Sequence, residues 1–359
     1  MRLALVGTGL IGASVGLAAK RAGVDWVGGH DADEEAAGVA LEREAVDEVG
    51  SLPELLAEAD LAVVAAPVTV LPALVEEVIA RAPERCTVTD VGSTKEWSLR
   101  LSERFVGGHP VCGREAHGPA HATADLFDGA TWFLTPVAAT DPERYRLVHG
   151  FVASLGAVPV AIDPKAHDRL VALTSHLPHA LANLLVNQAG AGRIEGHDPL
   201  AAAGGSLRDM TRVAGANPRI WVDIFLDNAP ELAEALAQHR RRVEQLEEWL
   251  TERNAGALAR WIGEASENRR RMLAEAYPDP GELQQVTVHI PDRPGVLAGI
   301  TQALGAERIN VEDFELRHFS ADRGGVLTIL VSGAEQAARA AGLLEAQGYG
   351  ASVTPVLPS

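Results

Sequence analysis

The chain begins with a short apolar run that leads directly into three closely spaced glycines, Gly7, Gly9 and Gly12. A G-x-G-x-x-G pattern between a strand and a helix is typical of the turn that binds the pyrophosphate of a dinucleotide. The first glycine permits a tight turn, the second lets the backbone approach the phosphates, and the third allows close packing of helix and strand. The pattern predicts a nucleotide-binding βαβ unit; a secretion signal is the alternative for this apolar run.

Asp31 stands at the end of the second expected strand, roughly 20 residues beyond the glycines. A carboxylate at this position accepts hydrogen bonds from the adenosine ribose hydroxyls and repels a 2′-phosphate, so the sequence predicts NAD rather than NADP. The alternative for Asp31 is a solvated acid in an acidic loop. The residues expected to contact NAD are Gly7, Thr8, Gly9, Leu10, Ile11, Gly12, Asp31 and Pro67.

From residue 1 to about residue 164, short β-branched runs alternate with helical segments rich in Ala and Leu. This alternation predicts an α/β domain with a Rossmann-like, doubly wound parallel sheet, the NAD-binding domain of residues 1–164. Strands are expected at residues 2–6, 26–29, 61–65, 87–90, 105–107, 131–134 and 158–162.

Beyond residue 164 the strand pattern disappears, and apolar residues recur at helical spacing over 177–188, 229–250 and 255–276. An all-helical domain is therefore expected at 165–277, with its apolar faces buried in the same chain or against a two-fold partner. A linker rich in Pro and Gly follows at 278–282. The last segment, 284–359, has the element order βαββαβ of a ferredoxin-like domain.

The chain carries 31 basic and 49 acidic residues, a net charge of −18. Nucleic acid and anionic lipid surfaces are therefore not expected partners. An anionic substrate would need positive charge gathered locally from a few side chains. Cys86 and Cys112 are too few for a disulfide framework, so a reducing, cytoplasmic location is expected.

Four segments carry polar side chains that neither a plain core nor a plain surface requires: 90–95, 107–115, 174–179 and 208–212. The first two follow expected strands of the nucleotide domain. Because ligands of open α/β sheets lie beyond the carboxyl ends of the strands, both segments are expected at the cofactor crevice.

The glycine pattern followed by DVGSTK, GGHPVCGRE, ALTSHLPH and RDMTRVA, in this order, resembles the prephenate and arogenate dehydrogenase family over residues 1–275. The resemblance implies NAD-dependent oxidation of the substrate ring at C4 with loss of the ring carboxylate as carbon dioxide. Prephenate would give 4-hydroxyphenylpyruvate and NADH on the tyrosine pathway. Arogenate, which bears an amino instead of a keto group on its side chain, stays open as the alternative substrate.

By this resemblance His109 is the neutral base that accepts a hydrogen bond from the C4 hydroxyl, which becomes strongly acidic as hydride leaves. Ser93 is the hydroxyl that bonds the same oxygen. Arg212 is the guanidinium that holds the side-chain carboxylate. The remaining residues expected at the substrate pocket, on the first turns of a helix or at the pocket mouth and wall, are Ser175, His176, His179, Glu115, Asp209 and Trp221.

His176 and His179 are three residues apart and so share one helix face, a spacing that also occurs in zinc sites. No Glu-x-x-His pattern or cysteine accompanies them, and the chemistry requires no metal. No metal is therefore expected.

The C-terminal segment resembles the ACT domain, a small module that senses amino acids, over nearly all of 284–359. A glycine after the first strand would let the backbone approach a ligand carboxylate at a helix N-terminus. Tyrosine is the expected effector, and a pairing module without ligand is the alternative. The residues expected to contact the effector are Asp292, Gly295, Val296, Leu297 and Asn310.

Two rival classes also couple a nucleotide domain to helices. The β-hydroxyacid dehydrogenases and imine reductases do so, but the hydroxyacid enzymes rely on a lysine in an early helix of the second domain, and 177–188 contains none. A non-enzymatic NAD sensor signalling through the ACT-like unit is the other. The set of Ser93, His109 and Arg212 favours an enzyme, and the helical domain favours a homodimer.

Overall fold

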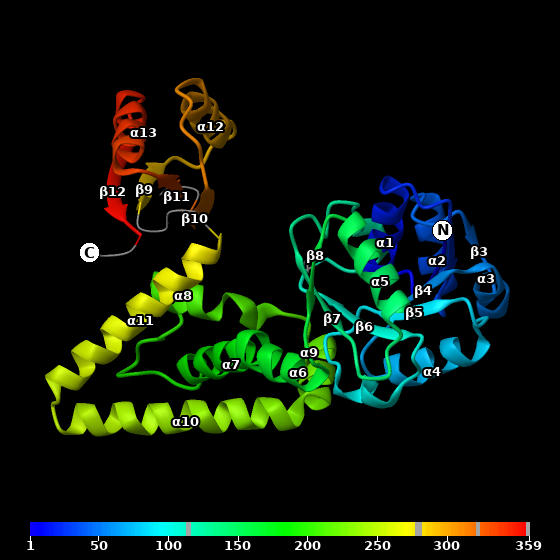
Figure 1. Cartoon of the computed structure of the whole chain (residues 1–359). Helices are drawn as coiled ribbons and strands as arrows, with labels where there is room; N and C mark the ends of the chain where they lie inside the picture. Colours follow the sequence, from blue (N-terminus) through cyan, green and yellow to red (C-terminus); the bar gives the residue numbers. More distant parts are fainter. Residues whose placement is uncertain (113–115, 277–281, 321–323, 357–359) are drawn as a thin grey trace. The chain divides into compact units, whose positions relative to one another are not determined.

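The structure is a computed structural model that describes residues 1–112, 116–276, 282–320 and 324–356 (Figure 1). The chain divides into two compact units, Met1–Arg241 and Arg242–Ser359. The glycines, the polar segments and most of the expected site residues lie in the first unit. The C-terminal ferredoxin-like segment lies in the second.

The first unit is built on an eight-stranded sheet with the order β3-β2-β1-β4-β5-β6-β7-β8. This order, in which the chain runs from β1 outward through β2 to β3 and then crosses back to β4 on the other side of β1, is the doubly wound arrangement that the sequence predicts. The strands are β1 Arg2–Val6, β2 Trp26–His30, β3 Glu48–Val49, β4 Leu61–Val64, β5 Thr87–Asp90, β6 Phe105–Pro110, β7 Thr131–Thr135 and β8 Val158–Ala161.

The expectation of an entirely parallel sheet is wrong at β7, which pairs antiparallel with β6 and parallel with β8. A parallel neighbour requires a long crossover, usually a helix. Within the described part of the connection from β6 to β7, the helical structure is one short 3₁₀ turn, Pro119–His121. The two-residue strand β3 was not expected because it is too short to show an alternating pattern.

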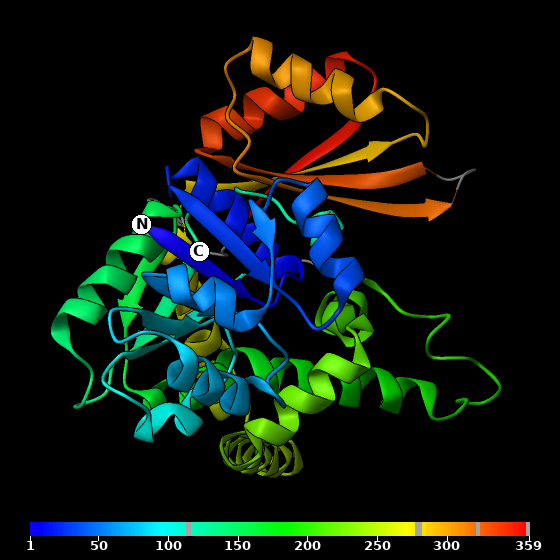
Figure 2. The same ribbon diagram turned by 90° about the vertical axis from the view of Figure 1, so that its right-hand side faces the viewer.

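Helices cover both faces of this sheet (Figures 1 and 2). On one face α1 (Leu10–Arg21) and α5 (Pro142–Ser154) bury Val15 and Phe151 against the strands. On the other face α3 (Leu52–Glu58) and α4 (Leu71–Arg81) bury Leu56 and Val75. The remaining helix, α2 (Glu34–Glu42), is capped at its start by the Asp33 side chain. These two apolar layers hold the carboxyl ends of the strands in fixed positions.

A helical segment follows β8, with α6 at Pro164–Val171 and α7 at Leu177–Gly190 joined by a π-helical turn, Ala172–His176. The expectation that Ser175 and His176 lie in the first turns of a helix is therefore wrong. Pro178 has no N–H to donate to the preceding turn, and the wider π turn stands just where that bond would be missing.

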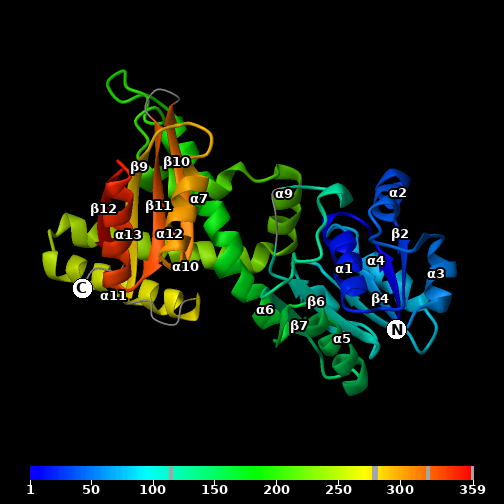
Figure 3. The same ribbon diagram turned by 90° about the horizontal axis from the view of Figure 1, so that it is seen from above.

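Three further helices follow: α8 (Gly205–Thr211), α9 (Pro218–Asp227) and α10 (Ala229–Thr251), of which α10 continues into the second unit. Figure 3 shows α9 between α7 and the large sheet. The side chain of Asn217 caps α9.

The second unit contains α11 (Ala255–Ala276) and an antiparallel sheet with the order β10-β11-β9-β12. Its elements are β9 Leu283–Ile290, α12 Val296–Ala306, β10 Asp313–Ser320, β11 Gly324–Ser332, α13 Ala334–Ala346 and β12 Gly350–Pro355. This βαββαβ order confirms the ferredoxin-like expectation. Strand β10 begins at Asp313 rather than at residue 309, and residues 278–281 of the expected linker lie outside the described residues.

Candidate active site

A cleft of about 610 Å³ lies at the carboxyl ends of β1, β4, β5 and β6, where α/β sheets bind their ligands. Two groups of residues that the sequence singles out line it together: the cofactor-loop residues and the two residues expected to act on the substrate hydroxyl. The lining residues of these groups are Gly9, Leu10, Ile11, Gly12, Pro67, Ser93 and His109.

The three glycines of the loop have three different surroundings. Gly7 has a φ of 101°, in the left-handed region, and a Cβ there would lie 2.1 Å from the carbonyl oxygen of Ala65. A Cβ on Gly12 would lie 2.0 Å from the carbonyl oxygen of Gly7. A Cβ on Gly9 would meet no protein atom within 4 Å. The protein therefore requires glycine at positions 7 and 12 for its own packing, whereas at Gly9 the open space fits a ligand phosphate at the N-terminus of α1.

The carboxylate of Asp31 is held by the cofactor loop itself. Its Oδ2 accepts hydrogen bonds from the backbone N–H of Thr8 at 2.5 Å and from the Thr8 hydroxyl at 3.0 Å. Its Oδ1 accepts one from the N–H of Asp33 at 3.0 Å. Gly7, Thr8 and Asp31 do not line the described cleft, and Thr8 contributes instead by orienting the carboxylate at the end of β2.

His109 lies near the end of β6, and its Nδ1 is 2.8 Å from Nε2 of His167. Burial, followed by the nearby His167, Lys95 and His176, holds the pKa of His109 well below its usual 6.5. The imidazole is therefore neutral at pH 7, the state in which it accepts a proton. The hydroxyl of Ser93, also in the cleft lining, is buried and has no hydrogen-bond partner among the described residues. That orphaned hydroxyl fits a polar ligand group beside His109.

The buried ion pair of Lys95 and Asp90 holds the backbone segments that carry Ser93 and His109. The Lys95 ammonium donates to Asp90 Oδ2 at 2.6 Å, and both side chains are fully buried. The same carboxylate accepts the backbone N–H of Gly92 at 2.8 Å and of Gly108 at 2.9 Å. Because Gly92 precedes Ser93 and Gly108 precedes His109, Asp90 holds both segments at once.

Arg212 does not line this cleft. It is exposed, in the 3₁₀ turn that follows α8, and its charge helps burial to lower the pKa of His179. His179 in turn stacks on Trp221, with ring centroids 3.4 Å apart. The structure thus brings Arg212, His179 and Trp221 into one neighbourhood on the side of α9 that faces α7.

Helical periodicity explains why the neighbourhood of Arg212 and Trp221 is separate from the cleft, because α9 has one face toward α7 and another toward the cleft. Trp221 and Phe225 lie on the first face. Arg219, Ile220, Asp223 and Ile224 line the cleft. Among the described residues that line the cleft, the arginine is Arg219, which the sequence did not single out.

The other expected pocket residues differ in burial and in where they lie. His176 is buried, contacts Trp221 at 6.2 Å between centroids, and has its pKa lowered to about 4, chiefly by burial. Ser175 accepts a hydrogen bond through its backbone carbonyl from His179. Asp209 is exposed on α8. Glu115 lies outside the described residues.

Three matches to family models cover most of the chain: "Prephenate dehydrogenase, nucleotide-binding domain" over residues 15–161, "Prephenate dehydrogenase, dimerization domain" over 163–264, and "ACT domain" over 285–348. The prephenate dehydrogenase of Bacillus subtilis (strain 168) is 30% identical over 356 residues, with 96% of this chain and 95% of that protein covered. The chain belongs to the prephenate dehydrogenase family.

Solved structures of the family resemble this one closely. Prephenate dehydrogenase from A. aeolicus, in complex with hydroxyphenyl propionate and NAD⁺, has a TM-score of 0.71 and 29% identity over 76% of this chain and 98% of that one. Synechocystis arogenate dehydrogenase has a TM-score of 0.69 and 31% identity over 76% and 100%. The expected family, fold and class, an NAD-dependent dehydrogenase of this family, are thereby confirmed.

Sequence reasoning missed three cleft or near-cleft groups besides Arg219: Asp223, His167 and Asp168. The segment 165–168, K-A-H-D, follows β8, which runs antiparallel to β6, so the rule that polar side chains after parallel strands gather at the crevice does not single it out. Among described residues, no three His, Cys, Asp or Glu are grouped to hold a metal, and no helix is long and apolar enough to cross a membrane. The expected absence of a metal stays a prediction.

Asp292, Gly295, Val296 and Leu297 lie at or just before the start of α12, whereas Asn310 follows its C-terminal end. Gly295 has a φ of 89° and starts this helix. Val296 is buried in the core of the ACT sheet, so only its backbone is open to a ligand, and Leu297 is partly buried there. Asn310 is exposed and donates to Glu312 at 2.9 Å, and Asp292 is exposed.

Proposed function

We propose that the protein catalyses the NAD-dependent oxidative decarboxylation of prephenate to 4-hydroxyphenylpyruvate, carbon dioxide and NADH. The observation that carries this proposal is the meeting of a partly buried, neutral His109 and the orphaned hydroxyl of Ser93 in the cleft that starts at the cofactor loop. The substrate, rather than the enzyme class, is the part that remains to be tested.

Different residues of the chain would bind the cofactor and act on the substrate. The open space at Gly9 and the N-terminus of α1 would hold the pyrophosphate of NAD, and Asp31 would bond the adenosine ribose. When bound there, NAD would supply the acceptor for the hydride that leaves ring C4 of the substrate. Ser93 and His109 hold the C4 hydroxyl, and His109 takes its proton as it becomes acidic. Loss of the ring carboxylate then aromatises the ring.

Arg212 is our candidate for the side-chain carboxylate, with Ser175, His176, His179, Asp209, Glu115 and Trp221 as the proposed surrounding residues. Its neighbourhood with His179 and Trp221 supports this role, since both residues could enclose an aromatic-sized substrate. Arg219 is a second candidate because it lines the cleft.

Arogenate stays the alternative substrate, because the similarity of the Synechocystis arogenate dehydrogenase nearly equals that of the A. aeolicus enzyme. Steady-state NADH formation should be measured with prephenate and with arogenate, each with NAD and with NADP. We expect the highest kcat/KM with prephenate and NAD. A higher value with arogenate would reassign the substrate, and a preference for NADP would remove the role of Asp31.

We also propose three domains, 1–164, 165–277 and 284–359, and a homodimer formed through the helical one. Large apolar side chains are exposed on its helices, including Leu184, Leu226, Ile262 and Met272. Exposed apolar surface of this kind marks an interface. Light scattering after size exclusion should give twice the chain mass of 37.8 kDa, and a monomer would reject the dimer.

Tyrosine is the proposed effector of the ACT unit, with Asp292, Gly295, Val296, Leu297 and Asn310 as its proposed contacts. The left-handed Gly295 and the free N-terminus of α12 suit a ligand carboxylate. Removal of residues 282–359 should abolish inhibition by tyrosine. Inhibition that persists would place the effector at the active site. Cys86 and Cys112 are both free thiols, and the cytoplasmic location stays a prediction.

A further inference from the structure

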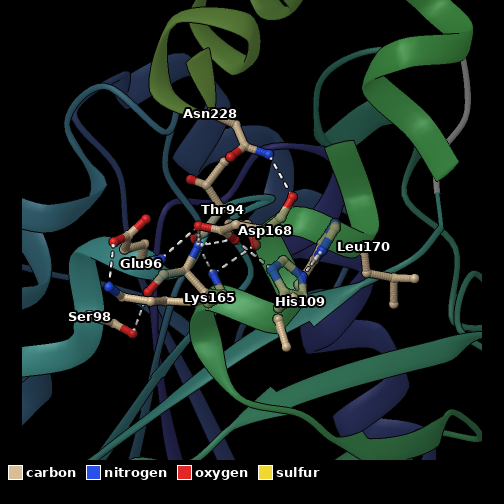
Figure 4. A network of polar contacts seen from close by, with 12 residues as sticks. Thr94, Glu96, Ser98, His109, Lys165, Asp168, Leu170 and Asn228 are labelled. Atoms are coloured by element: carbon tan, nitrogen blue, oxygen red, sulfur yellow. Dashed lines mark hydrogen bonds and ion pairs between the residues drawn. The ribbon is translucent and has the colours of Figure 1, made fainter. Parts of the chain in front are cut away.

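The partly buried His109 ends a chain of hydrogen bonds that runs through His167 to Asp168, two buried side chains; Figure 4 shows His109 and Asp168 in this network. Its Nδ1 is 2.8 Å from His167 Nε2, and His167 Nδ1 is 2.7 Å from Asp168 Oδ1. The His167 side chain is fully buried and that of Asp168 is nearly so. His167 and Asp168 lie about one turn into α6. This part of the helix contacts His109 on β6 and Lys95 in the segment after β5.

The chemistry of these atoms fixes where the hydrogens lie. An ionised carboxylate only accepts, so His167 Nδ1 must carry hydrogen. A neutral imidazole has one ring hydrogen, so His167 Nε2 is an acceptor and His109 Nδ1 must donate to it. The other nitrogen of His109, Nε2, then holds a free lone pair. That is the atom which can take a proton from a ligand in the cleft.

We propose that His167 and Asp168 are positioning residues that hold His109 in this tautomer and stabilise the positive charge that it gains. This inference rests on the proposed role of His109 and names two further residues that act through it. The hydrogen bond that the middle ring donates to the carboxylate sets which nitrogen of the outer ring is basic, and the negative charge favours the imidazolium once the substrate proton arrives.

Asp168 also ties the base to the segment that carries Ser93. Its two oxygens accept the backbone N–H of Lys95, at 2.8 and 3.1 Å, and the N–H of Glu96 at 2.7 Å. Its own carbonyl accepts a hydrogen bond from the amide of Asn228 at 2.9 Å. One carboxylate therefore fixes both groups that face the substrate hydroxyl.

The decisive variant is Asp168→Asn. An amide oxygen at the Oδ2 position keeps the bond from Glu96 N–H and the longer one from Lys95 N–H, at 3.1 Å, while the NH₂ at the Oδ1 position faces His167. The ring hydrogens then reverse, and His109 Nε2 carries hydrogen and cannot accept a proton. We expect kcat to fall by most of the 10²–10⁴-fold that a positioned base contributes, with the Kd of NAD unchanged. Asp163→Asn on the same helix is the control. Asp163 caps α6, a role that Asn performs equally well, so turnover should not change.

A purely structural role for Asp168 is separated by combining variants. If Asp168 acts through His109, then Asp168→Asn should cause no further loss of kcat in a His109→Asn background. Losses that multiply in the double variant would overturn the proposal. If His109→Asn alone leaves turnover intact, the proposed function fails first, so the two failures are distinguishable.

Two variants of the middle residue give a second test. His167→Gln can place its amide oxygen to accept from His109 Nδ1–H, whereas His167→Phe keeps the ring packed against Phe133 without an acceptor. We expect the Gln variant to retain at least tenfold more turnover than the Phe variant, with equal thermal stability. Equal turnover in the two would contradict a positioning role.

The pH profile supplies a readout that a change of stability does not move. The charged and titratable groups around His109 are His167 on α6, Lys95 after β5 and His176 in the π turn, with Asp168 behind His167 and Asp90 paired with Lys95. Asp168→Asn removes the negative charge that is hydrogen-bonded to His167, so the acid limb of kcat should move to lower pH in this variant. An acid limb that stays in place would contradict the role of the charge.

Discussion

His109 and Arg212 represent two opposite ways of building a binding site within the first unit. His109 is partly buried, is linked by hydrogen bonds through two further side chains to the backbone, and is held beside Ser93 by the Lys95–Asp90 pair. Arg212 is exposed in a short turn, and its clearest described neighbour is His179. The base is therefore preorganised by the fold of one chain, whereas the guanidinium is not enclosed by it.

This difference separates two kinds of function. A preorganised base acts mainly in the transition state, so its loss should appear in kcat. An exposed guanidinium that holds a remote carboxylate binds ground state and transition state alike, so its loss should appear in KM. The predictions below test that division.

The largest expected effect is that of His109→Asn. Loss of the base should lower kcat by about 10²–10⁴-fold while the Kd of NAD stays the same, because the cofactor loop is untouched. The control is His149→Asn, since His149 is exposed on α5. Turnover near that of the unaltered protein would remove His109 from the mechanism.

A second comparison sets Arg212→Ala against Arg219→Ala. Loss of a charge-assisted hydrogen bond costs about 1.5–3 kcal/mol, which corresponds to roughly 10–100-fold in KM for prephenate. We expect this rise in Arg212→Ala, with kcat within a few-fold of the unaltered protein. Arg219→Ala should change KM for prephenate less. The opposite ranking would transfer the substrate carboxylate to the cleft side of α9.

The third comparison concerns the cofactor loop. Gly12→Ala forces a Cβ against the Gly7 carbonyl and should lower the free energy of unfolding by about 1–3 kcal/mol. The Cβ of Gly9→Ala meets open space, so the free energy of unfolding should not change. The Kd of NAD should rise at least about tenfold, or 1.4 kcal/mol. Gly38→Ala, in the middle of α2 with no atom within 4 Å, is the control and should stabilise slightly. Denaturant titration and NAD titration separate the cases, and a destabilised Gly9→Ala would contradict the assignment.

The sequence predicts best what depends on local pattern. The strands, the helix α1 and the glycine roles follow from residue spacing, and Gly7 has the positive φ that a tight turn needs. The direction of β7 depends on a connection without a long helix, which no strand pattern reveals. His167 was missed because its role comes from the packing of α6 against β6, a contact between residues far apart in the chain. Arg219 was missed because the face that α9 turns toward the cleft depends on tertiary packing.

Acid conditions act on the same buried histidines. The pKa values of His109 and His176 are both lowered in the folded protein, the latter to about 4, so the unfolded chain binds more protons below pH 6.5. Their contribution to stability is complete above pH 6.5 and is lost as the pH falls from 6.5 toward 4. Activity at low pH should therefore be taken from initial rates, with circular dichroism as the check on folding.

The pH dependence of kcat, at saturating prephenate and NAD, tests most directly whether a buried neutral imidazole is the base. Because protonated His109 cannot accept the substrate proton and burial lowers its pKa, kcat should stay constant from pH 8 to about 6.5 and fall only below it. His109→Asn should lack this limb. A limb centred at or above pH 6.5, or one that persists in His109→Asn, would contradict the account.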